Sequence, residues 1–149
     1  MKKIHVGFLL AYDYDKLKLS IPPVYKSADK IFIAQDINYN TWTGNKFNVD
    51  SSFYDWLNEI DVDNKIVIYK DNFYLSELTG IQNDTRERHM LSLKMGIGNW
   101  LIQIDSDEYF LDFEKFVKQL RKYDYYLDTP EENPIQISGF HVDVYKYLE

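Results

Sequence analysis

The sequence contains no cysteine among its 149 residues. This excludes disulfide bonds, thiolate metal sites and a cysteine nucleophile, and it fits a reducing compartment, so we expect a cytoplasmic protein. No apolar stretch approaches the ~20 residues of a transmembrane helix. Basic residues are also in deficit, with 17 Lys and Arg against 24 Asp and Glu. The resulting net charge of -7 argues against non-specific nucleic-acid binding, which needs a basic face.

The sequence is rich in apolar and aromatic residues. Hydrophobic residues make up 45% of the chain and aromatic residues 17%, which argues against a disordered chain. The length suits one domain with a sizeable core, and we predict a single domain over 1–149. A basic start before the apolar run 4–11 invites comparison with a signal peptide, but no small-residue cleavage site follows. We therefore interpret 4–11 as the first core strand.

Apolar runs alternate with segments of helical periodicity, which predicts an α/β fold with three layers and a mostly parallel, Rossmann-like sheet flanked by helices. The predicted strands are 4–11, 30–36, 64–69, the apolar run that ends at 104, and 135–143. The predicted helices are 16–28, 51–60, 84–95 and 113–120.

Local signals refine two of these helices. Pro22 and Pro23 interrupt the first, and we expect a short turn followed by a helix that restarts near Pro23. Asp84 and Glu87 have the spacing of a capping box, which predicts a helix start at Asp84. That start places Arg86, Arg88 and His89 close to the positive end of the helix dipole.

The acidic stretch after residue 104 is the strongest functional signal. Asp105, Asp107 and Glu108 follow a predicted buried strand, at the edge of a parallel sheet where ligands bind. Side chains two apart on an extended segment point the same way, so we expect Asp105 and Asp107 to face one site. Two close carboxylates repel unless a cation lies between them, and their oxygens suit Mg²⁺ or Mn²⁺. The alternative interpretation is a solvated acidic turn.

The region 84–110 resembles the nucleotide-binding N-terminal half of family 2 glycosyltransferases, which have a GT-A-type fold. In that family an Arg-containing helix leads through Gly and an aromatic residue to an apolar strand and an acidic motif, here Gly98, Trp100 and Asp105-Ser106-Asp107-Glu108. The resemblance implies a glycosyltransferase that binds a nucleotide-diphosphate sugar and transfers the sugar to an unknown acceptor, in surface-glycan synthesis of the bacterial type.

The resemblance also implies site residues. The donor-binding candidates are Ala11, Tyr12, Asp13, Asp36, Arg86, Arg88 and Asp105. We prefer Arg86, with Arg88 close behind, as the basic residue that steadies the diphosphate or the acidic motif. The metal ligands are Asp105 and Asp107, with Mn²⁺ or Mg²⁺ as cofactor, and Asp107 is the better direct ligand. Each candidate also has a plain structural interpretation, as a loop residue, a turn-forming Asp or an exposed charged turn.

Two parts of the sequence leave alternatives open. The Asn-rich segment 37–49 predicts a loop over the same sheet edge, either covering a donor or packing against the fold. The chain ends soon after its last predicted strand, which leaves no segment to which the acceptor half of a glycosyltransferase can be assigned. We therefore assign no general base and no other catalytic residue. A non-catalytic interaction domain that self-associates into a homo-oligomer is therefore an alternative. A metal-dependent nucleotidyltransferase ranks lower, because 12–15 is not a Gly-rich phosphate loop.

Overall fold

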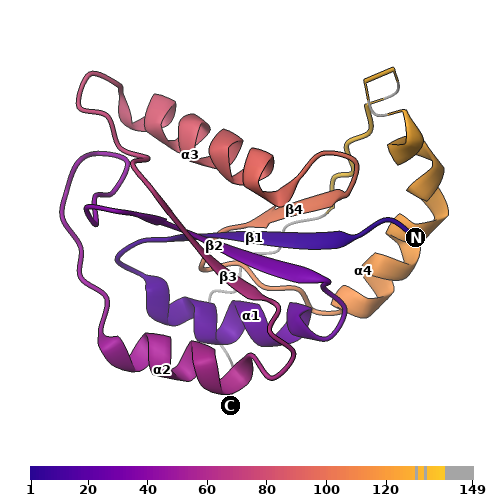
Figure 1. The fold of residues 1–149 in the computed structure, drawn as a ribbon, viewed down its shortest axis with the longest axis horizontal. Helices are drawn as coiled ribbons and strands as arrows, with labels where there is room; N and C mark the ends of the chain where they lie inside the picture. Colours follow the sequence, from indigo (N-terminus) through magenta and orange to yellow (C-terminus); the bar gives the residue numbers. More distant parts are fainter. Residues whose placement is uncertain (130, 133, 140–149) are drawn as a thin grey trace, which may run out of the picture.

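Four parallel strands form the centre of the protein in the computed structural model, which describes residues 1–129, 131–132 and 134–139. The strands are β1 (Ile4–Leu10), β2 (Lys30–Asp36), β3 (Ile66–Asp71) and β4 (Trp100–Ile104), and they lie in the order β3-β2-β1-β4 (Figure 1). The two central strands, β1 and β2, are buried along nearly their whole length. The two outer strands are mostly half-buried, as expected where a sheet ends.

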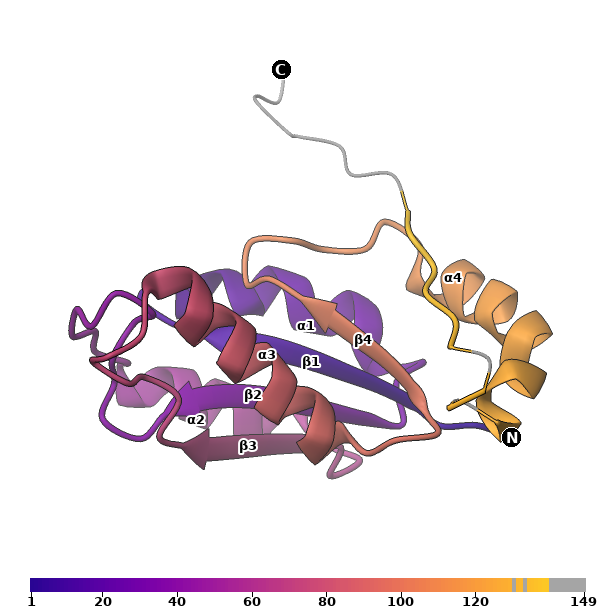
Figure 2. The ribbon, with the colours of Figure 1, turned by 90° about the horizontal axis from the view of Figure 1, so that it is seen from above.

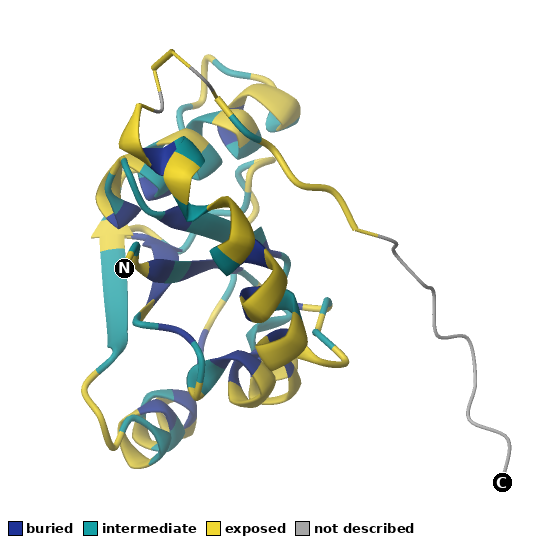
Figure 3. Ribbon diagram, turned by 90° about the vertical axis from the view of Figure 1, so that its right-hand side faces the viewer, coloured by how far each residue is buried: buried dark blue, intermediate teal, exposed yellow. Residues whose placement is uncertain are grey.

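Helices cover both faces of this sheet, as predicted. They are α1 (Leu17–Tyr25), α2 (Ser51–Ile60), α3 (Gly80–Met95) and α4 (Phe113–Leu120), with short 3-10 helices η1 (Tyr14–Lys16) and η2 (Arg121–Asp128). One buried cluster joins the sheet to α1, α2 and α4, and a second joins it to α3. Figures 1 and 2 show α3 alone on its side of the sheet, and Figure 3 shows the burial concentrated between the layers. The three-layer parallel α/β fold is therefore confirmed.

The order of the strands reverses beside β1. The connections through α1 and α2 step outward from β1 to β2 and then to β3, all in parallel. The connection through α3 then returns across the sheet and places β4 on the other side of β1. In open parallel sheets a ligand binds beyond the carboxyl ends of the two strands at such a reversal. In this protein those strands are β1 and β4.

Pro22 and Pro23 do not interrupt α1, contrary to the prediction. The helix runs through both, and their side chains lie on its exposed face, while Ser20, Ile21 and Val24 are buried. Each proline removes a hydrogen bond to the carbonyl four residues earlier. Those carbonyls belong to Lys18 and Leu19, which are exposed and therefore near water. Packing of the opposite face holds the helix together.

The start of α3 was also predicted wrongly. The helix begins at Gly80, because Thr79 and Gln82 form a capping box one turn before Asp84. The Thr79 Oγ1 atom accepts from the Gln82 N–H at 3.3 Å, and Gln82 Oε1 accepts from the Thr79 N–H at 2.9 Å. Arg86 and Arg88 consequently lie in the second and third turns of α3, beyond the reach of a helix-terminus effect.

The remaining elements match the prediction to different degrees. Helices α2 and α4 both have the predicted bounds, with Asp50 and Asp112 as their N-caps. The 3-10 helix η2 directly follows α4, in a segment for which neither a helix nor a strand was predicted. The predicted last strand is not formed over 135–139, and its remainder, 140–143, lies outside the described residues. No helix in the described part of the chain is long and apolar enough to cross a membrane.

Close contact between α3 and β1 depends on Gly7. A Cβ atom added at Gly7 would lie 2.8 Å from Met95 Sδ and 2.9 Å from Leu91 Cδ2. We expect Gly7→Ala to lower the free energy of unfolding by about 1–3 kcal/mol through overpacking, measured by urea denaturation. Gly139→Ala is the matched control, because no described atom lies within 4 Å of its added Cβ. Equal stability of Gly7→Ala and wild type would show that α3 does not pack this closely.

Candidate functional site

The loops that follow β1 and β4 are tied together at the reversal of strand order. The Ser106 hydroxyl donates to Asp13 Oδ2 at 2.6 Å, although the two residues are 93 positions apart. The Ser106 carbonyl in turn accepts from the Ser20 hydroxyl of α1 at 2.7 Å. Both Ser106 and Ser20 are buried. The loop after β4 is thus anchored to the opposite loop and to α1, which brings Asp13 and the acidic motif together.

Asp105 pairs with Arg88 on one side of this edge. The Arg88 Nη2 atom donates to Asp105 Oδ1 at 2.7 Å, and its Nε atom donates to Asp84 Oδ1 at 2.6 Å. Burial lowers the pKa of Arg88, but the hydrogen bonds to the two carboxylates outweigh burial and raise it. A half-buried guanidinium held between two carboxylates is well ordered and remains charged.

Asp107 pairs with Lys16 on the other side of the edge. The Lys16 Nζ atom lies 3.5 Å from Asp107 Oδ2 and 3.8 Å from Asp13 Oδ2. The side chains of Lys16 and Asp107 are 52% and 56% exposed, so this looser contact stabilises the fold by only ~0–1 kcal/mol. The sequence analysis did not identify Lys16 as a site residue. Its side chain reaches Asp107 because the chain bends after β1, and the sequence does not show the direction of that bend.

A turn explains why Asp105 and Asp107 have different partners. Extended backbone ends at Ile104, so the alternation that predicted a common direction does not continue through the motif. The Glu108 N–H donates to the Asp105 carbonyl at 3.1 Å. The Glu108 side chain accepts from the Asp105 N–H at 3.1 Å and closes the turn. Glu108 therefore shapes the loop that carries the two aspartates.

The same contacts limit metal binding in this conformation. Within residues 1–129, 131–132 and 134–139, no three His, Asp or Glu side chains lie close enough together to share an ion. Asp105 and Asp107 each have a side-chain cation as partner. A divalent ion at these carboxylates would have to compete with Arg88 and Lys16, so the arrangement does not form a ready metal site.

Asp36 has a full set of structural partners at the end of β2. Its Oδ1 atom accepts from the backbone and side-chain N–H groups of Asn40 and from the Asn38 N–H. Its Oδ2 atom accepts from the N–H groups of Phe73 and Tyr74. With only 3% of its surface exposed, Asp36 ties the loop after β2 to the loop after β3.

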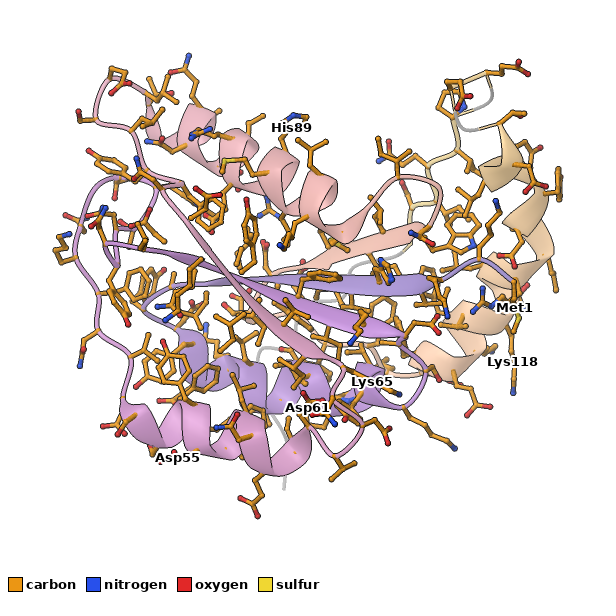
Figure 4. The ribbon with its side chains drawn as sticks, viewed as in Figure 1. Met1, Asp55, Asp61, Lys65, His89 and Lys118 are labelled. Carbon is orange, nitrogen blue, oxygen red and sulfur yellow. The ribbon has the colours of Figure 1, made fainter. Side chains whose placement is uncertain are left out.

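The other donor candidates lie at different distances from the motif. Ala11 is half-buried directly after β1, and Tyr12 next to it is 75% exposed. Arg86 donates from Nη2 to the Asn72 carbonyl at 3.1 Å, beyond the end of β3. Arg88, and not the preferred Arg86, contacts Asp105, because residues two apart on a helix differ by about 200° in direction. His89 lies on the outer side of α3, away from the sheet (Figure 4).

Glu87, which the sequence analysis assigned to a capping box, is instead a buried carboxylate next to Arg88. Glu87 is 6% exposed, and its Oε2 atom accepts from the indole N–H of Trp42 at 2.6 Å. Burial raises its pKa to about 7, with smaller upward contributions from Asp36 and Asp84, while Trp42 and Arg88 act in the opposite direction. The signal in the sequence is a buried stripe with helical spacing, formed by Asn83, Glu87, Leu91 and Met95.

The loop 37–49 packs against α3. Packing against the fold was one of the two roles that its composition left open. The Trp42 carbonyl accepts from Asn83 Nδ2 at 3.0 Å, and Asn83 is completely buried. The same amide also contacts the Leu75 and Leu78 carbonyls, and Asn83 Oδ1 accepts from the Leu75 N–H. Asn83 therefore holds the loops after β2 and β3 onto one helix.

Comparison of the chain with family models, with curated proteins and with solved structures gives no match. The basis for assigning a function is therefore the fold, the two cation–carboxylate clusters and the resemblance of the acidic motif.

The raised pKa of Glu87 predicts a pH-dependent stability. The pKa of a Glu in an unfolded chain is ~4.3. Because folded Glu87 binds its proton more tightly, its contribution to stability is lost as the pH rises from that value to about 7. We expect Glu87→Gln to raise the free energy of unfolding by about 1–3 kcal/mol more at about pH 8 than at about pH 4, where Glu87 is protonated in the folded protein. Urea denaturation at both pH values measures this, and a constant difference would contradict it.

The contacts of Asp36 predict a large loss of stability when its carboxylate is replaced, even in the absence of a ligand. We expect Asp36→Asn to lower the free energy of unfolding by about 2–4 kcal/mol, because an amide cannot accept from all these N–H groups. Asp71→Asn is the matched control at the end of the neighbouring strand, where the carboxylate accepts from the local partners Tyr69 and Asn72. Similar losses in the two variants would show that Asp36 does not hold the loops together.

Proposed function

We propose that this chain is a glycosyltransferase domain that binds the diphosphate of a nucleotide sugar at the carboxyl edge of β1 and β4. The supporting observation is that two cations from different elements, Arg88 and Lys16, meet acidic residues from both loops at the reversal of strand order. Arg88 offers a planar donor group and Lys16 an ammonium, both suited to phosphate oxygens. The acidic motif supplies the resemblance to family 2 glycosyltransferases.

The proposal includes Mn²⁺ or Mg²⁺ as cofactor, with Asp105 and Asp107 as its ligands. A divalent ion bound with a diphosphate stabilises the negative charge on a leaving nucleoside diphosphate. Because Arg88 and Lys16 pair with these carboxylates, an ion gains access only when the diphosphate draws the two cations away. Donor and metal are therefore expected to bind together, more tightly than either alone. Transfer to an acceptor, cytoplasmic location and a role in surface-glycan synthesis belong to the same proposal through the resemblance.

A non-catalytic domain with the same fold is the second candidate. It is favoured by the same pairing, since Asp105 and Asp107 already have internal partners that compensate their charge. The two candidates differ in turnover. A transferase releases nucleoside diphosphate from a bound sugar donor in the presence of acceptor, or slowly by transfer to water, whereas an interaction domain does not.

Donor binding is tested by thermal shift with uridine and guanosine diphosphate sugars, with Mn²⁺ and with a chelator. We expect one donor to stabilise the protein by about 2–3 kcal/mol at 100 times its dissociation constant, and most strongly with Mn²⁺. Asp107→Asn and Arg88→Gln should each remove most of this shift, because each removes one charged group from the proposed site.

Asp128→Asn is the matched control for Asp107→Asn. Asp128 is also an exposed carboxylate paired with a lysine, Lys2, but it lies at the amino-terminal end of β1. Its replacement should leave donor binding unchanged. The absence of a shift with every donor, both with Mn²⁺ and with the chelator, would contradict the proposed function.

A further inference from the structure

Trp42 contacts α3 in three ways, although it belongs to the loop after β2. Its indole N–H donates to Glu87 Oε2 at 2.6 Å, and its carbonyl accepts from Asn83 Nδ2 at 3.0 Å. Its ring centroid lies 5.7 Å from the guanidinium carbon of Arg88, within the range of a cation–π contact. The three partners lie on two successive turns of α3, Asn83 on one and Glu87 and Arg88 on the next, so Trp42 is fixed in both position and orientation.

Arg88 is consequently held from two directions. Asp84 and Asp105 bind its guanidinium through Nε and Nη2. The Trp42 ring lies beside the same group and is itself fixed by Glu87. Asp84 and Glu87 belong to α3, as Arg88 does, whereas Asp105 and Trp42 come from two different loops. Arg88 therefore connects the loop after β2 to the loop after β4.

The charge on Glu87 acts on this arrangement from inside the protein. The charged groups around Glu87 are Asp36 at the end of β2 and Asp84 and Arg88 on α3, and Arg88 is the one cation among them. The carboxylate of Asp36 is surrounded by backbone and amide N–H groups. An ionised Glu87 thus adds negative charge in a poorly solvated position next to the Arg88 side chain.

We propose that Glu87 and Trp42 are positioning residues for Arg88, and that the charge on Glu87 sets how strongly Arg88 binds an anion at the carboxyl end of β4. The first part concerns this chain alone, while the second rests on the proposed function. A neutral Glu87 leaves the positive charge of Arg88 less compensated, so an anion binds more tightly. Conversely, a bound anion favours the protonated form of Glu87.

The positioning role is tested without a ligand by NMR. The indole N–H signal of Trp42, assigned with Trp42→Phe, and the Nε–H signal of Arg88 are followed between about pH 5.5 and 8.5. We expect both to shift with one common midpoint near pH 7, since burial raises the pKa of Glu87 to about 7. In Glu87→Gln, which keeps an acceptor for Trp42, neither signal should show this transition.

Trp100 provides the matched control within the same spectrum. Its indole N–H donates to Asp124 Oδ1 at 2.7 Å, so it is a second indole–carboxylate pair, at the other end of the molecule. Its signal should be the same in wild type and Glu87→Gln. Asp124→Asn should move the Trp100 signal and leave the transition of Trp42 unchanged. A transition of Trp42 and Arg88 that persists in Glu87→Gln, or the absence of one in wild type, would overturn the positioning role.

The effect on anion binding is measured by calorimetry with uridine diphosphate glucose, whose diphosphate carries no proton that titrates near neutral pH. In wild type we expect the affinity to fall by about 5-fold or more between about pH 6 and pH 8. Glu87→Gln should bind tightly at both pH values, and Trp42→Phe should bind more weakly at both. The exposed His89 is present in both wild type and Glu87→Gln. The difference between the two proteins in the pH dependence of affinity therefore reports on Glu87 alone.

The outcomes separate the two proposals. An unaltered fall in affinity in Glu87→Gln would overturn the charge coupling while leaving donor binding intact. Failure of every nucleotide sugar to bind would overturn both the proposed function and the coupling to an anion. The NMR transitions would then still decide whether Glu87 and Trp42 position Arg88.

Discussion

The ion pair between Arg88 and Asp105 links α3 to the carboxyl end of β4, and the arrangement of the candidate site depends on it. On the sheet side, Asp105 begins a turn that is closed by Glu108 and anchored through Ser106 to Asp13. On the helix side, Arg88 is held by Asp84 and lies beside Trp42. This one contact therefore brings three loops and a helix together where the strand order reverses.

Much of the fold follows from short-range pattern. The strands β1, β2 and β4 were predicted because branched and aromatic residues are concentrated in them. Helices α2 and α4 were predicted because apolar residues recur in them at helical spacing, and in the structure Asp50 and Asp112 cap them. Two helices were predicted wrongly where a second signal or tertiary packing outweighed the local signal that was used. Thr79 and Gln82 form a capping box that precedes the similar pattern at Asp84. In α1, burial of one face outweighed the two hydrogen bonds that the prolines remove.

The candidate site was predictable only in part, for a different reason. Asp105 and Asp107 could be identified because they follow an apolar strand, but their partners Arg88 and Lys16 depend on the direction of side chains after a turn. The pair of Trp42 and Glu87 joins residues 45 positions apart, and nothing in the local sequence of either indicates the other. Asp36 was identified as a donor-binding candidate, whereas in the structure its carboxylate accepts from four backbone N–H groups and the Asn40 side chain.

The central claim is that an anionic donor binds between Arg88 and Lys16. The most direct measurement is an NMR titration of the labelled protein with uridine diphosphate glucose and Mg²⁺, read at each backbone and arginine side-chain signal. Binding between Arg88 and Lys16 should cause the largest changes at Arg88, Asp105 and Lys16, with little change at Arg86 or around Asp61 at the opposite edge of the sheet (Figure 4). Changes confined to the opposite edge, or none at saturating ligand, would contradict it.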